Sequence, residues 1–263
     1  MSKNNVYMLP VRQDSSFDIS LRICSVSLID RWFYSRAVHA CWVFYWNPDS
    51  GAEIVSDGKK IVLTSRQAVL IPPFTLYSTM NRKSFRHFYI HFDAPSPYDR
   101  VARGVLPFPG MEVCKFFRDL KKCGDAPVFS VLLRRMLYHY LSEIPADRFL
   151  NPDEPVLDPR IQRAAEVMNH HLRNPLSNRE LCRKAGMNLN GFYKAFQNEL
   201  GMTPKKYLLQ LRMEQARISL LHSDATIEEI AAGIGYADRF QFSKAFRQYY
   251  SVPPASFRNR SKI

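Results

Sequence analysis

The sequence predicts an α+β protein of two domains, an antiparallel β domain followed by an all-α domain. With 263 residues, the chain is longer than the roughly 100 to 200 residues of a usual single domain. Residues 21–92 consist of short β-branched and aromatic segments separated by turn signals, and the apolar spacing becomes helical after Pro109. A proline-rich stretch then separates two parts, so we expect domains at 1–144 and 160–263 joined by a linker at 145–159.

The β domain contains five strand candidates of alternating or continuous apolar character. A hairpin between two of them is indicated by Asp57-Gly58, a pair typical of tight turns. The close spacing fits a small antiparallel barrel or a sandwich. The candidates are residues 38–46, 53–57, 60–64, 68–72 and 85–92.

Two helices are predicted after the strands, at 111–122 and 128–143. In the second, apolar residues recur at helical spacing along one stripe, Phe129, Leu133, Met136 and Tyr140. The stripe fits packing against the barrel and also fits a dimer seam, and the two are compatible if more than one face is apolar.

Composition indicates the class of partner. The chain is 46% hydrophobic and carries 37 Lys and Arg against 24 Asp and Glu, a net charge of +13, with most of the excess after Arg160. Such a balance favours a polyanion such as nucleic acid. The first ten residues lack the apolar segment of a signal peptide, and the most apolar run, 38–46, is too short to span a bilayer. We therefore expect a cytoplasmic protein without membrane contact.

The helical domain contains the same two-helix unit twice. A capping box begins each unit, Ser177-x-x-Glu180 in the first and Thr226-x-x-Glu229 in the second. A glycine ends the first helix of each unit, and Asn188 or Asp238 is placed to cap the second helix. The glycines are Gly186 and Gly235. Two helix-turn-helix units joined by a linker helix are therefore expected.

The second helix of each unit has one apolar and one polar face. Phe192 and Phe196 share a face, as do Phe242 and Phe246, and we expect these to be core. In a helix-turn-helix reader, the second helix enters the major groove of DNA. The opposite face therefore holds the candidate DNA-binding residues, which are Asn190, Tyr193, Lys194, Gln197, Arg239, Phe240, Ser243, Lys244 and Arg247.

The segments LRMEQARISLL and IAAGIGYADRFQFSKAFRQYYSVPPASFR closely resemble the DNA-binding domain of the AraC/XylS family of bacterial transcription regulators. The resemblance covers about 100 residues and implies two readers in successive major-groove segments of double-stranded DNA. It further implies an activator that contacts RNA polymerase and acts as a homodimer. Two positions differ from what a DNA-reading helix with a polar face would carry. Gly191 is a helix-weakening residue in the first reader. Phe240 is apolar, and it either contacts a thymine methyl group or covers the adjacent core.

The front half resembles the regulatory domain of the same family through FRHFYIHFDAP and SDGKKIVLTSRQAVLIPP. This resemblance implies a cupin-like barrel that binds a small effector, followed by dimerisation helices. Aromatic rings and imidazoles on the predicted strands suit a carbohydrate, and strand alternation leaves open which face is internal. The candidate effector-binding residues are His39, Trp42, Trp46, Tyr89 and His91.

We predict no catalytic residue, no cofactor and no metal. The five cysteines form no CxxC pair, and RHFYIHFDAP has neither a His-x-His pair nor the glutamate of metal-binding cupins. The sequence lacks a GxSxG elbow and a glycine-rich phosphate loop. Two other classes stay open, a DNA-repair protein of the alkyl-transfer type and an RNA-binding or protein-interaction module.

Overall fold

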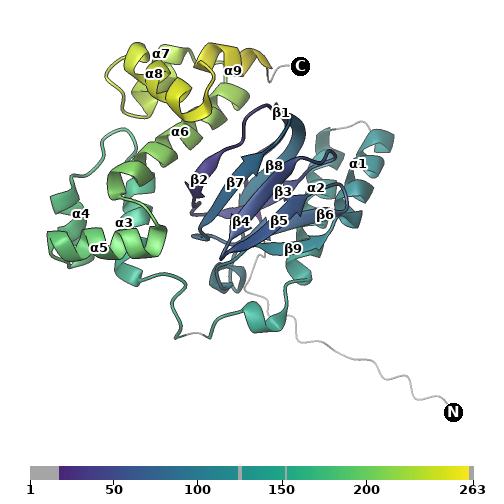
Figure 1. Cartoon of the computed structure of the whole chain (residues 1–263), viewed down its shortest axis with the longest axis horizontal. Helices are drawn as coiled ribbons and strands as arrows, with labels where there is room; N and C mark the ends of the chain where they lie inside the picture. Colours follow the sequence, from purple (N-terminus) through teal and green to yellow (C-terminus); the bar gives the residue numbers. More distant parts are fainter. Residues whose placement is uncertain (1–17, 124–125, 152, 261–263) are drawn as a thin grey trace.

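The computed structural model describes residues 18–123, 126–151 and 153–260. The N-terminal segment expected to lack a signal peptide therefore lies outside the described residues. So do the first residues of the predicted domain 1–144 and the last residues of the predicted domain 160–263. A β domain of two sheets, a helical pair and a helical domain follow one another along the chain (Figure 1). No helix among the described residues is long and apolar enough to cross a membrane.

The β domain consists of two antiparallel sheets. The five-stranded sheet has the order β1-β8-β3-β6-β9 and the four-stranded sheet has the order β2-β7-β4-β5. The barrel is therefore open, with two facing sheets in place of a closed ring. The strands are β1 Ser20–Ile29, β2 Tyr34–Ala37, β3 Trp42–Trp46, β4 Ala52–Ser56, β5 Lys59–Leu63, β6 Gln67–Ile71, β7 Tyr77–Asn81, β8 Phe85–Asp93 and β9 Leu106–Pro109.

Each of the five predicted strands is present within a few residues, although β3 begins at Trp42, four residues later than expected. The Asp57-Gly58 hairpin is confirmed, because both residues have positive φ and Ser56 pairs with Lys59. Four strands were not predicted individually: β1, β2, β7 and β9. Their sequences mix polar and apolar residues, and β1, β2 and β9 lie at sheet edges.

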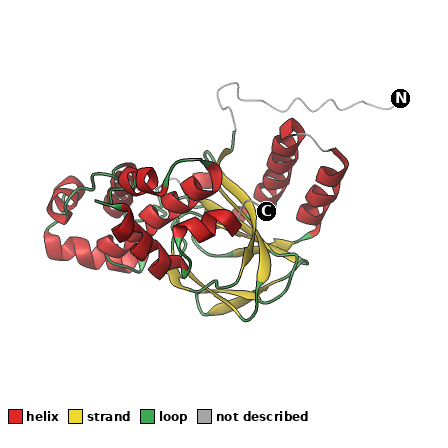
Figure 2. Cartoon of the chain, turned by 90° about the horizontal axis from the view of Figure 1, so that it is seen from above, coloured by secondary structure: helices red, strands yellow, loops and turns green. Residues whose placement is uncertain are grey.

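Two hydrophobic layers lie on either side of the five-stranded sheet. One lies between the sheets and includes Val43 and Tyr45. The other lies beneath α1 (Met111–Cys123) and α2 (Ala126–Ser142), which cover the outer face of this sheet in Figure 2. The predicted stripe on α2 packs into this second layer, with the Tyr140 ring centroid 5.2 Å from that of Phe44. The apolar stripe of α2 is thus observed to pack against the β domain. That α2 also forms a dimer interface stays a prediction.

The helical domain contains two small cores. The first is built by α3 (Pro159–His170), α4 (Asn178–Ala185) and α5 (Leu189–Leu200) with the start of α6 (Pro204–His222). The second is built by the end of α6 with α7 (Ile227–Gly233), α8 (Arg239–Tyr250) and α9 (Pro254–Arg260). Because α6 contributes to both cores, it joins the two helix-turn-helix units as a shared element (Figure 1).

Local sequence signals explain where these helices begin. Both predicted capping boxes are present, with Ser177 and Thr226 each accepting from the backbone of the glutamate three residues later. Asp158 caps α3, which carries proline at its first position. The segment before it includes a 3-10 turn at Ala146–Arg148, and the Leu150 amide donates to the Arg100 carbonyl at 2.9 Å.

Candidate functional site

The second helix of each helix-turn-helix unit is α5 in the first unit and α8 in the second, and we call these the reader helices. Asn188 caps α5 by accepting from the Gly191 amide at 2.8 Å, and Asp238 caps α8 by accepting from the amides of Phe240 and Gln241. Each helix buries its two phenylalanines completely, as predicted. The opposite face of each helix is therefore the one that remains available for a partner.

The nine predicted DNA-binding residues lie on these available faces. Ser243 is half-buried, and the other eight are exposed: Asn190, Tyr193, Lys194, Gln197, Arg239, Phe240, Lys244 and Arg247. Tyr193 receives a hydrogen bond from the Asn178 side chain of α4, which ties its ring to the first helix of the unit. The placement is compatible with the predicted readers, and the contact with DNA itself stays a prediction.

The structure clarifies the two departures from a polar reader. Phe240 is 71% exposed, so it does not cover the adjacent core, and the Arg239 guanidinium lies 4.9 Å from its ring centroid. At Gly191, an added Cβ would lie 3.1 Å from the capping oxygen of Asn188. The absence of a side chain at Gly191 therefore leaves space for the capping side chain of Asn188. By helix propensity alone, glycine at this position would be unfavourable.

The helix α6 sets the separation of the reader helices. It has 19 residues and thus a length of about 28 Å at 1.5 Å per residue. Thr203 caps it, and Tyr207, Met213 and Leu220 are buried along its length, about two turns apart. A continuous helix packed at both ends makes a rigid connector, as expected for two readers in successive groove segments.

The β domain is docked against the first helix-turn-helix unit. Arg36 donates to the carbonyl of Gly201, the residue that ends α5, and Gln210 of α6 donates to the carbonyl of Val38. Arg103 forms an ion pair with Glu199 at 3.3 Å. Val38 and Phe74 join the first helical core. These contacts hold the β domain in one position relative to the reader helices.

A cavity of about 350 Å³ lies between the two domains. Its β-domain wall comes from the inner face of the five-stranded sheet, the four-stranded sheet and the segment before β2. Its other wall comes from α6, the end of α8 and the start of α9. The lining side chains that carry hydrogen-bonding groups or rings include Trp32, Tyr34, His39, Tyr45, Tyr77, His87, Tyr89, His91, Gln210, Glu214, Arg217, Tyr249, Tyr250 and Phe257.

Three of the predicted effector-binding residues line this cavity, namely His39, Tyr89 and His91. Trp42 and Trp46 do not line this cavity, because both belong to the layer beneath α1 and α2. Strand alternation sends them to the face opposite Tyr45. The helical pair covers that face, and the Trp46 indole lies 5.3 Å from Phe117 of α1. The inner face is therefore the one that carries Tyr45.

Burial controls the charge state of the cavity. It lowers the pKa of His39 to about 3 and that of His87 to about 3, so both imidazoles are neutral. Burial alone would raise the pKa of Glu214, but the charge of Arg217 and contact with His91 outweigh it, and the pKa lies well below its usual value. Arg217 contacts the Glu214 carboxylate at 2.6 Å and stacks on Tyr89 at 4.6 Å.

The helical wall of the cavity was missed from the sequence. Gln210, Glu214 and Arg217 follow one another on the face of α6 turned to the β domain, and Tyr249 and Tyr250 end α8. Their spacing fits an ordinary solvated or core helix face. Only the docking of two domains brings them to the histidines, so no local signal could have identified them.

These observations define a class of protein: a β domain with an internal cavity docked on a helical domain with two capped helix-turn-helix units. Residues 181–260 match the family model described as a helix-turn-helix domain. The C-terminal region thus contains a helix-turn-helix domain, and the predicted resemblance to the AraC/XylS family is confirmed over these residues.

Two curated relatives are regulators of sugar operons. The lactose operon transcription activator of Staphylococcus xylosus is 22% identical over 152 residues, which cover 57% of this chain and 54% of the relative. The raffinose operon transcriptional regulatory protein of Pediococcus pentosaceus is 22% identical over 233 residues, 82% of this chain and 83% of the relative. The chain thus spans only about half the length of the first of these relatives.

Solved structures share the whole fold at low identity. Apo ToxT from Vibrio cholerae, as a point variant, superposes with a TM-score of 0.68 at 12% identity and covers 94% of this chain and 98% of its own. ToxT bound to an unsaturated fatty acid gives a TM-score of 0.63 at 11% identity, with 94% and 97% coverage. The two-domain arrangement described above is therefore the ToxT fold.

Proposed function

We propose that the protein is a sequence-specific transcription regulator that binds double-stranded DNA through α5 and α8 and responds to a small effector in the interdomain cavity. The observation that carries the proposal is the pair of capped reader helices at the two ends of α6, with polar, exposed faces and a basic composition. The names of the sugar-operon relatives support a regulatory role over an enzymatic one. We further propose that the protein is an activator, that it forms a homodimer and that it contacts RNA polymerase. Residues 145–159 are proposed as the linker between its two domains.

The cavity favours an uncharged, hydroxyl-rich effector. Among the described lining residues, Arg217 is paired with Glu214, and the imidazoles of His39 and His87 are neutral. Tyrosine hydroxyls such as those of Tyr45 and Tyr77, which bond to each other at 2.9 Å, offer hydrogen bonds and rings of the kind a sugar uses. We therefore propose a carbohydrate as the effector.

DNA binding is tested by its dependence on salt. Binding to a duplex from upstream of the protein's own gene should weaken by roughly 10³ to 10⁵ between 50 and 200 mM salt, if six to ten phosphates are contacted. Single-stranded RNA of equal length serves as the competitor. A flat salt response, or a preference for the RNA, would contradict the proposal and favour a different class of binding module.

The effector is tested by a thermal-shift screen of sugars. A sugar at about 100 times its Kd should stabilise the protein by about 2.7 kcal/mol. Tyr89→Phe removes one cavity hydroxyl and should reduce the shift, whereas Trp42→Phe lies beneath the helical pair and should preserve it. Equal loss in both variants would place the effector outside the cavity.

A further inference from the structure

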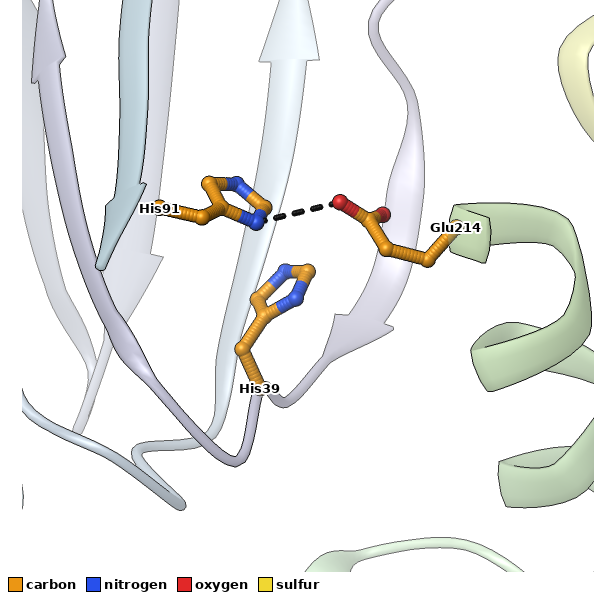
Figure 3. Close-up of side chains that lie close together, drawn as sticks. All are labelled: His39, His91 and Glu214. Atoms are coloured by element: carbon orange, nitrogen blue, oxygen red, sulfur yellow. Dashed lines mark ion pairs between the residues drawn. The ribbon is translucent and has the colours of Figure 1, made fainter. Parts of the chain in front are cut away.

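Three metal-binding side chains from both domains meet in the cavity. His39 lies between β2 and β3, His91 lies on β8 and Glu214 lies on α6. Their ligand atoms all fall within 4.8 Å of one another, and His91 Nδ1 is 3.0 Å from the Glu214 carboxylate. Figure 3 shows the two imidazoles and the carboxylate turned toward a common point.

The surroundings of these groups are those of a ligand set more than of a solvated cluster. His91 is 3% exposed, and its ring centroid is 4.8 Å from that of His39. Within the described part of the chain, no residue forms a hydrogen bond with the His39 ring. His39 is half-buried and lines the cavity, and a metal ion there would give its ring the partner that the described residues do not supply.

We propose that His39, His91 and Glu214 bind a Zn²⁺ ion that joins the β domain to the helical domain. Two imidazole nitrogens and one carboxylate are a set that Zn²⁺ takes in proteins, with a fourth position left to water or another oxygen ligand. All three residues line the cavity, so the fourth position faces it. Arg217 contacts Glu214 Oε1 at 2.6 Å, the same oxygen that lies 3.0 Å from His91 Nδ1, and so holds the carboxylate turned toward His91.

The site is complete only when the domains are docked, because Glu214 comes from α6 and both histidines come from the β domain. A ligand shifts an equilibrium only by binding one state better than another. Zn²⁺ therefore stabilises the docked arrangement over any in which α6 leaves the β domain. The inference rests on the proposed effector cavity and deepens it, since an oxygen of the effector could take the fourth position.

The local sequence around His87 and His91 gives no sign of this site. That segment has no His-x-His pair and no glutamate of its own. The structure supplies the carboxylate from the other domain, which no spacing within one segment can reveal. His87 is the histidine nearest to His91 in sequence. Its Nδ1 forms a hydrogen bond with Asn47 Oδ1 at 2.7 Å, and it stays outside the proposed ligand set.

The test is a Zn²⁺ titration of the chelator-treated full chain against a chromophoric competitor. We expect one Zn²⁺ per chain and a rise in Tm on binding. Changes to outer-shell partners typically weaken metal binding 10- to 100-fold, so loss of a ligand in His39→Gln or Glu214→Gln should weaken it by about 100-fold or more. The double variant His170→Gln/His171→Gln removes two adjacent exposed histidines and should leave affinity unchanged.

Three outcomes would overturn the inference. The wild-type chain could bind no Zn²⁺, binding could vanish in the His170/His171 double variant, or it could survive Glu214→Gln, which would leave a site within the β domain alone. Circular dichroism and the metal-free Tm establish that each variant is folded. If a variant does not fold, the wild-type chain is loaded with Co²⁺ instead. Its absorption bands report directly whether nitrogen and oxygen ligands hold the ion.

The proposed function and the metal site fail independently. Zn²⁺ binding is measured without DNA or sugar, and DNA binding is measured on the same chelator-treated protein. Loss of metal binding with intact, salt-dependent DNA binding would overturn only the metal site. The converse result would retain the metal site and refute the regulator.

Discussion

The two helix-turn-helix units share a scaffold and differ in what surrounds it. Both begin with a capping box, both bury two phenylalanines on the reader helix, and both end that helix in the left-handed conformation. The first unit is tied to the β domain through Arg36 and Arg103. The second borders the cavity, where the Tyr249 ring lies 5.8 Å from that of Tyr34. The two units thus share one fold and differ in their neighbours.

This difference gives the units unequal positions in a regulator. The first unit is held by direct hydrogen bonds to the β domain. The second unit contributes Tyr249 and Tyr250 to the cavity wall, and α6, which both units share, contributes Gln210, Glu214 and Arg217. A ligand in the cavity therefore contacts α6 and the second unit, and it shifts the domain arrangement only by binding one arrangement better than another.

The largest predicted effect tests whether the two cores are equivalent. Phe196→Ala and Phe246→Ala each empty a fully buried site, and each should lower the free energy of unfolding by about 3 to 5 kcal/mol. Phe240→Ala is the control, because that ring is 71% exposed and its loss should change stability by less than about 0.5 kcal/mol. Urea unfolding measures all three. A much smaller cost in one unit would show that its core collapses around the gap.

The next effect compares the reader faces. Lys194 and Lys244 occupy matching positions, both are exposed, and neither forms an ion pair with a described residue. Replacing either with Ala should weaken binding to the specific duplex by about 1 to 3 kcal/mol if it contacts a base. Each variant should then relax preference at a different base pair. Lys205→Ala removes an exposed charge at the start of α6 and is the control. If Lys194→Ala or Lys244→Ala weakens binding equally to all duplex sequences, that lysine contacts a phosphate.

A smaller effect separates the two helix ends. Gly201 ends α5 at φ 66° and Ser251 ends α8 at φ 63°. Left-handed geometry costs an L-residue roughly 1 to 2 kcal/mol, so Gly201→Ala should destabilise by at least that amount. For Ser251→Gly, the entropy of glycine offsets part of the gain, and we expect stabilisation of about 0.5 kcal/mol. Both changes are measured by Tm.

The Gly201 variant carries a second cost that a double variant can isolate. An added Cβ would lie 2.6 Å from the side chain of Leu76, which belongs to the β domain. In a Leu76→Ala background, Gly201→Ala should lose this steric term and keep the backbone term. Equal costs in both backgrounds would show that the Leu76 side chain moves aside without penalty.

The smallest effect tests the capping boxes as matched devices. Ser177→Ala and Thr226→Ala each remove the acceptor for one backbone amide, and each should cost about 1 kcal/mol of stability. Urea unfolding of the two variants measures the costs side by side. A cost confined to one variant would show that the other helix start is held by its tertiary contacts alone.

Sequence reasoning worked where a local pattern carries the structural cause. Alternation and turn residues located the central strands, and cap residues located the ends of helices such as α4 and α8. It missed β2 and β7, whose short, partly polar sequences become strands by pairing with each other. It also misplaced Trp42 and Trp46, because alternation separates two faces but does not say which face the helical pair covers.

The sequence by itself determined the two helix-turn-helix units, their caps and their buried phenylalanines, since these depend on residues within a few turns of each other. It also determined the nine candidates for DNA contact, eight of them exposed, through the period of the helix. Only the tertiary structure decided the interdomain cavity and the meeting of His39, His91 and Glu214. The physical reason is that side chains far apart in the chain become neighbours through domain docking, which depends on surface complementarity and leaves no periodic signal in the sequence.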